Sequence, residues 1–158
     1  MIRLAEMKDM EHILTIFENA RKYMREQNNP NQWNNGHPAK TLLEQDIEKR
    51  QLYVYEEDNE IHGVFMFLIG EDPTYAYIEG NWFSNETYGV IHRVASSGKM
   101  RGVMDKIVKY GYERINHLRI DTHEDNIPMQ KALDRNGFKK CGIIYLENGD
   151  PRIAYEKC

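Results

Sequence analysis

Apolar residues near the start of the chain recur at intervals of three and four positions, which is the repeat of one helical face. The residues that follow this repeat are Met10, Ile13, Leu14, Ile16, Phe17, Ala20, Tyr23 and Met24. They predict an amphipathic helix of about four to five turns, with Asp9 as its N-cap. A short strand at Ile2–Ala5 is expected before this helix, and a second helix from Lys40 to about Arg50 after it.

The middle and the end of the chain carry short runs rich in β-branched and aromatic residues, which predict strands. Residues 51–57 and 61–69 are expected to form a hairpin around the turn 57–60. Residues 138–146 and 152–156 are expected to form another hairpin around Asn148-Gly149. A further strand is predicted to begin at Tyr75–Ile78, before an irregular polar segment.

The pattern changes from strand to helix between Val90 and Ile115. Val90–Ala95 is typical of a strand, and the turn that follows, Ser96–Gly102, contains two glycines and two cations. Apolar positions then recur with helical spacing at Met104, Ile107, Val108, Gly111 and Ile115. A strand, a glycine-containing turn and a helix in this order direct free backbone N–H groups and the positive end of the helix dipole at one point. Such an arrangement can bind phosphate.

Three interpretations of this turn compete. A Walker-type P-loop is excluded, because Gly98-Lys99 is not followed by Ser or Thr and Arg93 stands where the first glycine belongs. A dinucleotide-binding fingerprint fails as well, because only Gly102 has the required context. An ordinary strand-to-helix connection stays open, since plain turns and phosphate-binding turns share their chemistry.

The segment Lys99–Met104 resembles a signature of the GNAT superfamily of N-acetyltransferases, Gln/Arg-x-x-Gly-x-Gly/Ala, whose backbone amides bind the pyrophosphate of acetyl-CoA. Lys99 replaces the Gln or Arg, and Met104 stands at the second small position. Asn126–Phe138 resembles the second motif of the family, an Asn followed by an amphipathic helix and Gly-Phe. Together with the long N-terminal helix, the two motifs extend the resemblance over nearly the whole chain.

The rest of the pattern completes a fold of the same kind. Leu118–Thr122 is predicted to be a strand parallel to Val90–Ala95, which requires a right-handed crossover. A short helix should begin at Pro128 and end at Gly137. We therefore expect a single domain over residues 1–158. Its fold class is α/β (α+β in some schemes), a GNAT-like mixed, mostly antiparallel central sheet with helices on both faces.

Composition narrows the class of protein further. The 158 residues suffice for one core, and the net charge is 21 − 25 = −4 without a basic block that would attract nucleic acid. The longest apolar run, Val64–Ile69, is far shorter than the ~20 residues that cross a bilayer, and no signal-peptide core is present. With only Cys141 and Cys158, a reduced cytoplasmic protein is expected rather than a disulfide framework.

The resemblance implies that an amine attacks the thioester of acetyl-CoA directly, while backbone amides of the central strand polarise the carbonyl. His92 is the candidate catalytic base, because imidazole titrates near neutrality and one of His92 and Arg93 should face the cleft. A histidine satisfied inside the sheet is the alternative. Many members of the family place a Tyr, as general acid, where this chain has Leu133. Tyr145 is the candidate that replaces it, and a core or hairpin tyrosine without a catalytic part is the alternative.

The residues expected to contact acetyl-CoA are Val94, Ala95, Gly98, Lys99, Met100, Arg101, Gly102, Val103, Met104 and Asn126. Trp33 and Trp82 lie on turn-rich segments, where an aromatic ring either lines a pocket or packs on the core. His123 and Glu124 follow a strand end, where open α/β sheets bind ligands. These four are the candidate substrate-binding residues. No metal site is expected, because the histidines form no His-Glu-x-x-His pattern.

The sequence thus predicts a cytoplasmic, acetyl-CoA-dependent N-acetyltransferase that acts on a primary amine of a small molecule. The alternative is a non-catalytic GNAT-like domain that binds CoA or a small ligand as a sensor or interaction module. Neither nucleic acid nor a membrane is expected as a partner. A homodimer is left open, and so is the identity of the amine.

Overall fold

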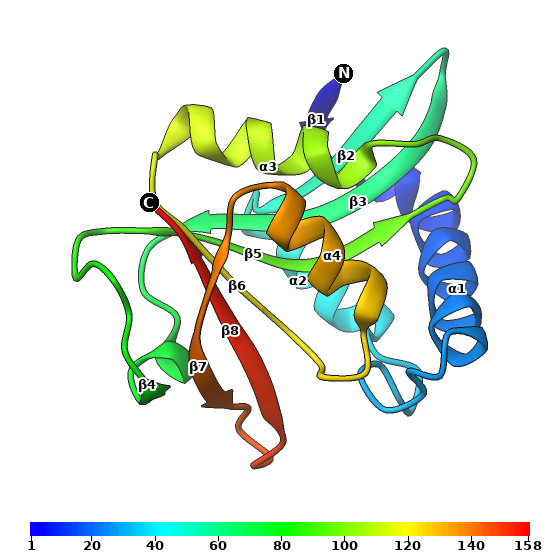
Figure 1. Cartoon of the computed structure of the whole chain (residues 1–158). Coiled ribbons are helices and arrows are strands. Elements are labelled where there is room, and N and C mark those ends of the chain that lie inside the picture. The colour runs from blue at the N-terminus through cyan, green and yellow to red at the C-terminus, as the bar shows by residue number, and fades with distance from the viewer.

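A sheet of eight strands runs through the molecule in the computed structural model, which describes residues 1–158 (Figure 1). The strands are β1 (Ile2–Leu4), β2 (Leu52–Glu57), β3 (Glu60–Ile69), β4 (Glu79–Gly80), β5 (Gly89–Ser96), β6 (Leu118–Thr122), β7 (Lys139–Tyr145) and β8 (Pro151–Lys157). Their order across the sheet is β1-β2-β3-β5-β6-β8-β7-β4. Neighbours are antiparallel except for β5 and β6, which are parallel.

Helices cover both faces of this sheet (Figure 1). They are α1 (Met10–Glu26), α2 (Lys40–Glu48), α3 (Val103–Arg114) and α4 (Ile127–Arg135). Phe17 of α1 and Leu43 of α2 are fully buried in one apolar cluster with residues of β2 and β3. Ile107 of α3 and Leu133 of α4 are fully buried in a second cluster on the other face. The predicted mixed sheet with helices on both faces is confirmed. None of the helices combines the length and the apolar character that a membrane span requires.

The sheet opens between its two parallel strands. The pairing of β5 with β6 is limited to Gly89 with Leu118 and Val90 with Arg119. Beyond Val90, β5 therefore has a free edge toward β6. Because side chains and backbone groups of both strands border this gap, ligands of α/β sheets typically bind at such a point.

A bulge in β5 lies beside the gap. Between two register points, β5 uses the three steps from His92 to Ala95, whereas β3 uses only the two from Val64 to Met66. Arg93, inside the bulge, has a φ of 53°, a left-handed conformation that is uncommon for residues with a side chain. Strained residues of this kind concentrate at functional sites.

Most of the predicted elements are confirmed. The N-terminal helix, both hairpins and the parallel pairing of the two central strands are present. The strand predicted at Tyr75–Ile78 is wrong, because a short 3₁₀ helix occupies Pro73–Tyr75. The carboxylate of Asp72 accepts the N–H of Thr74 and so begins this helix, and the ring of Tyr75 is buried beneath it.

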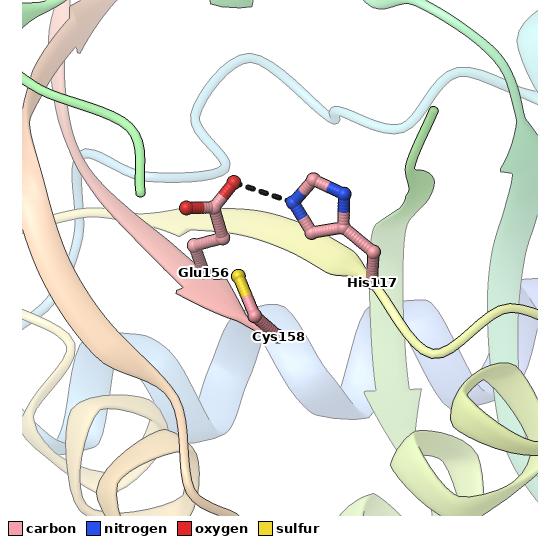
Figure 2. A group of neighbouring side chains, drawn as sticks. All are labelled: His117, Glu156 and Cys158. Atoms are coloured by element: carbon pink, nitrogen blue, oxygen red, sulfur yellow. Dashed lines mark hydrogen bonds and ion pairs between the residues drawn. The ribbon is translucent and has the colours of Figure 1, made fainter. Parts of the chain in front are cut away.

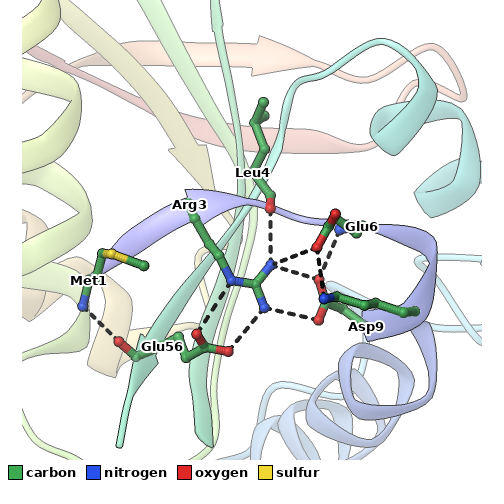
Figure 3. Close-up of polar contacts among 7 residues, drawn as sticks. Met1, Arg3, Leu4, Glu6, Asp9 and Glu56 are labelled. Carbon is green, nitrogen blue, oxygen red and sulfur yellow. Dashed lines mark hydrogen bonds and ion pairs between the residues drawn. The ribbon is translucent and has the colours of Figure 1, made fainter. Parts of the chain in front are cut away.

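An ion-pair network around Arg3 holds the N-terminal segment in place (Figure 3). The guanidinium donates to both oxygens of Asp9, at 2.9 and 3.0 Å, and to Glu56 of β2 at 3.0 Å. Asp9 also accepts the N–H of Glu6 at 2.8 Å. Asp9 is the N-cap residue of α1, as predicted, but its carboxylate makes no capping hydrogen bond to this helix and binds Arg3 and Glu6 instead.

Candidate active site

A cavity of about 750 Å³ lies where β5 and β6 separate. Its walls come from both strands, from the loop between α1 and α2, from the segment after β3 and from the hairpin between β7 and β8. The charged or titratable residues on these walls include Asp72, His92, Asp121 and Arg152. A space of this volume accommodates a small-molecule ligand.

His92 lies on β5 just before the bulge, with a carboxylate near each ring nitrogen. Its Nε2 is 2.6 Å from Oδ2 of Asp72, and its Nδ1 is 3.7 Å from Oδ2 of Asp121 on β6. The first contact is a hydrogen bond, and it assigns a ring proton to Nε2 because an ionised carboxylate only accepts. The second distance exceeds a hydrogen bond. Neutral His92 therefore has its basic lone pair on Nδ1, on the side of β6.

Asp72 is held firmly by its own surroundings. Its carboxylate accepts the N–H of Thr74 at 2.9 Å and the Thr74 hydroxyl at 2.7 Å, and its N–H donates to the Tyr88 hydroxyl at 2.9 Å. Burial alone would raise the pKa of Asp72, but the hydrogen bonds from His92 and Thr74 outweigh burial and lower this pKa to about 2. Asp72 is thus ionised at neutral pH and fixes the orientation of the His92 ring.

Asp121 is the one acidic residue of β6, and it projects beside His92. Its Oδ2 accepts a hydrogen bond of 2.7 Å from the hydroxyl of Tyr75. Burial, followed by the charge of Asp121, raises the pKa of Tyr75 well above its usual value. Tyr75 therefore stays protonated as the donor. Two carboxylates on either side of one imidazole form a negative site that favours a bound cation.

The bulge itself is fixed by an ion pair. Arg93 Nε is 2.7 Å from Oδ2 of Asp46 on α2, and Arg93 Nη2 is 2.9 Å from Oδ1. Asp46 is only 2% exposed and also accepts from Gln51 at 2.8 Å. This bidentate contact fixes the side chain of Arg93 to α2, and both residues line the cavity. Val94 lines the cavity, whereas Ala95 is buried in the cluster that contains α1 and α2.

The loop between α1 and α2 closes one side of the cavity. Trp33 lines it and packs its ring on Phe17, with ring centroids 5.5 Å apart. Oε1 of Gln32 accepts the side-chain amide of Asn126 at 2.8 Å. Oδ1 of Asn126 in turn accepts the N–H of Met129 and caps α4. Asn126 therefore lines the cavity while it holds this loop and α4 together.

The turn before α3 presents unpaired backbone donors. Gly102 precedes the helix with a φ of 76°, and no side chain caps this end. The N–H groups of Gly102, Val103, Met104 and Asp105 donate to no acceptor of the chain. Free N–H groups at a helix N-terminus, with the dipole behind them, suit a phosphate. The N–H groups of Gly98 and Lys99 instead donate to serine hydroxyls of the same turn.

The side chains of this turn leave those donors accessible. Met100 and Met104 pack against the second apolar cluster. Lys99 extends outward to an exposed ion pair of 2.9 Å with Glu60, and Arg101 is exposed. The Asp105 carboxylate accepts from Arg135 and Asn136 at the end of α4, at 3.1 and 2.9 Å. Its negative charge is thus partly compensated.

Four of the six predicted catalytic and substrate-binding residues do not line the cavity. Tyr145 is exposed and donates to Glu79 at 2.8 Å, because its inward neighbour Ile144 occupies the buried face of β7. The indole of Trp82 packs on Arg119 and donates to a backbone carbonyl. His123 accepts the N–H of Asp125, and Glu124 is exposed. None of the four is part of the cavity wall, and their roles in catalysis or substrate binding stay predictions.

Three side chains near the C-terminus could hold a metal ion: His117, Glu156 and Cys158 (Figure 2). Glu156 already accepts from His117 at 2.6 Å, from Arg119 at 2.8 Å and from the N–H of Phe83 at 2.6 Å. Burial and the charge of Glu156 raise the pKa of the Cys158 thiol, which disfavours the thiolate that binds metals. The group is best described as an internal ion-pair network, and the absence of a metal stays a prediction.

Asp72, Asp121 and Arg152 are site residues that the sequence alone did not indicate. Asp121 did carry a signal, because an acid inside the otherwise buried strand Leu118–Thr122 needs a reason to be there. Asp72 and Arg152 stand next to turns, where charged residues are ordinary. Their place in the site follows from the order of the strands.

No protein-family profile matches the sequence, and a search of curated proteins gives no match. Solved structures do match. A GNAT-family acetyltransferase of Streptococcus agalactiae 2603 is 29% identical, with a TM-score of 0.88 and coverage of 99% of this chain and 94% of that one. A GNAT-family acetyltransferase of Bacillus cereus ATCC 10987 is 21% identical, with a TM-score of 0.65 and coverage of 99% and 95%. An aminoglycoside acetyltransferase in complex with coenzyme A and kanamycin is 16% identical, with a TM-score of 0.66 and coverage of 99% and 92%. The last two show a likeness of fold alone.

Proposed function

We propose that this protein, a member of the GNAT superfamily by its fold and its match to an acetyltransferase of that family, transfers the acetyl group of acetyl-CoA to a primary amine of a small molecule. The observation that carries the proposal is His92, oriented by Asp72 beside the gap between β5 and β6. An oriented imidazole next to a free strand edge is what amine acylation requires, namely a base beside a place for the thioester.

The turn before α3 fits the pyrophosphate of acetyl-CoA. The unpaired N–H groups of residues 102–105 would hold its oxygens, with Lys99 and Arg101 near enough in sequence to add positive charge. The free edge of β5 beyond Val90 would then run beside the extended arm of the molecule. Backbone N–H groups near Val94 would polarise the thioester carbonyl, as the family resemblance implies.

The amine enters as a cation and must lose a proton before it attacks. Asp72 and Asp121 would attract the ammonium group, and Nδ1 of His92 would accept its proton, directly or through water. The amine nitrogen then forms a bond to the carbonyl carbon while the carbon–sulfur bond breaks, and the nitrogen releases its second proton to solvent. The departing thiolate takes a proton from the imidazolium or from solvent. Asp72 keeps the ring aligned and balances its positive charge throughout.

The proposal is tested with acetyl-CoA and a panel of small amines, with release of free CoA thiol as the readout and mass detection of the acetylated amine. The protein is kept far below the product concentration, because exposed Cys158 also reacts with thiol reagents. Turnover by the wild type that His92→Gln reduces about 100-fold or more supports the proposal. Tight binding of acetyl-CoA without turnover on any amine would favour the non-catalytic alternative.

A further inference from the structure

Arg152 is the most unusual charged residue of the cavity. It stands near the start of β8, is 6% exposed, and its side chain contributes to the cavity wall. Burial lowers the pKa of Arg152 from its ordinary value, against the opposing charges of Asp121 and Asp150. The guanidinium nevertheless keeps its proton, since arginine is not deprotonated in proteins.

This buried charge has no counterion. Arg152 donates to two backbone carbonyls, that of Pro151 at 2.8 Å and that of Gln32 at 3.3 Å, and it forms no ion pair with a carboxylate. A guanidinium has five N–H donors, so three of them have no acceptor in the chain. An unpaired buried charge is costly unless something compensates it.

Arg119, the other buried arginine of the protein, is paired with an acid, and so are the half-buried Arg3 and Arg93. Arg3 binds Asp9, Arg93 binds Asp46 and Arg119 binds Glu156, each at 2.9 Å or less. The half-buried Arg21 donates only to the backbone carbonyl of His37. Of its two buried guanidinium groups, the chain thus supplies a carboxylate to that of Arg119 and none to that of Arg152. A bound ligand can therefore supply the anion that Arg152 lacks.

Arg152 and the proposed base share one face of the sheet. In the ladder between β6 and β8, Asp121 pairs with Ala154, and side chains two residues apart on a strand point the same way. Arg152 therefore projects on the face of Asp121, and its Cα is about 7 Å along β8 from Ala154. A ligand of a few atoms can span from the His92 and Asp121 end of the cavity to Arg152.

We propose that the amine substrate also carries a carboxylate and that Arg152 binds this carboxylate. The substrates would then be amino acids and similar amino carboxylates. The inference rests on the proposed function, because it concerns the acceptor of the same reaction. Asp121 and Asp72 hold the ammonium end, and Arg152 holds the carboxylate end in the planar geometry that guanidinium groups favour. The ammonium group and the carboxylate of the substrate then each lie beside cavity residues of opposite charge.

The test compares amino carboxylates with analogues that lack the negatively charged carboxylate. Phenylalanine, phenylalaninamide and phenethylamine form one set, and glycine, β-alanine and 4-aminobutyrate vary the distance between amine and carboxylate. We expect kcat/KM for the best amino carboxylate to exceed that of its uncharged partner by about 100-fold or more, as sites built for a charged group reject analogues without it.

Variants assign this preference to Arg152. Arg152→Gln should reduce the ratio of kcat/KM between the amino carboxylate and its uncharged analogue to within a few-fold of one. Arg152→Lys should restore part of this ratio, since a lysine keeps the charge but not the planar fork. Arg21→Gln is the charge-matched control, because Arg21 is partly exposed near His37 and does not line the cavity. It should leave the ratio unchanged. Melting temperatures of all variants show which remain folded, and Arg152→Lys carries the test if Arg152→Gln does not fold.

The outcomes separate the two proposals. Equal rates on carboxylates and on their uncharged partners would overturn the role of Arg152 while the acetyltransferase proposal stands. If no amine is acetylated, equilibrium titration of the same compounds, followed by the fluorescence of Trp33 in the cavity wall, decides the matter. Carboxylate-dependent binding that is lost in Arg152→Gln supports the inference without catalysis. Binding that ignores the carboxylate, or no binding at all, overturns it.

Discussion

Asp72→Asn should remove both a source of stability and the partner of the proposed base. The folded protein lowers the pKa of Asp72 from 3.8 to about 2. The difference, 3.8 − 2 = 1.8, corresponds to about 2 kcal/mol at about 1.4 kcal/mol per pH unit. The Asp72 side chain is 16% exposed, so solvent screens this contribution little.

The sign of the pH dependence follows from the lowered pKa. An acid that is stronger in the folded state stabilises the protein fully above its unfolded pKa of 3.8, and this contribution is lost as the pH falls toward 2. At pH 7, Asp72→Asn should therefore be less stable than the wild type by about 2 kcal/mol, and the difference should shrink by about half by pH 3.

Urea unfolding, followed by tryptophan fluorescence at several pH values, measures this difference. Asp58→Asn is the matched control, because Asp58 is exposed in the turn between β2 and β3 with a φ of 52°, which Asn also tolerates. The control should show no such pH dependence. If Asp72→Asn were destabilised equally at pH 7 and pH 3, packing rather than charge would be the cause. The same variant should lower kcat by about 10- to 100-fold with CoA affinity unchanged, because the Asn side chain keeps the shape of the contact but not its charge.

Four further substitutions test three separate parts of the site. His92→Gln should also abolish the acidic limb of the pH–rate profile, and a profile identical to that of the wild type would exclude His92 as the base. Lys99→Ala should weaken CoA about fivefold, whereas Glu60→Gln should tighten it slightly by releasing Lys99 from its ion pair; calorimetric titrations in which neither changes CoA affinity would remove Lys99 from the phosphate site. Tyr145→Phe should leave kcat within about twofold, because the hydroxyl is bound to Glu79 outside the cavity. A large fall in steady-state kcat would return Tyr145 to the mechanism.

The elements that depend on local pattern were predictable. The strand, turn and helix from Val90 to Ile115 could be predicted because their signals, β-branched residues, two glycines and a helical repeat, lie next to one another in the chain. The strand prediction at Tyr75–Ile78 was wrong because aromatic residues are typical of strands, whereas Asp72 caps a 3₁₀ helix there. A three-residue capping contact overrode the apparent strand pattern.

The composition of the site was less predictable, because it depends on which strands become neighbours. His92 could be identified as a candidate from its place on the central strand, but its partner Asp72 is 20 residues away in the sequence. Arg152 enters the cavity only because β8 lies between β6 and β7 in the sheet. Tyr145 was one position off the buried face, since neighbouring residues of a strand point to opposite sides. Periodicity within a segment cannot supply such information about long-range pairing.

A single-turnover experiment tests the central claim most directly. The protein is held in excess over acetyl-CoA that carries an isotopic label in its acetyl group, and an amine is added. The quenched mixture is separated, and the masses of its components are measured by mass spectrometry. We predict that each labelled acetyl group appears on the amine with one free CoA, and that the protein itself carries none. Bound acetyl-CoA that stays intact, or CoA released with labelled acetate instead of acetylated amine, would contradict the assignment of this protein as an N-acetyltransferase.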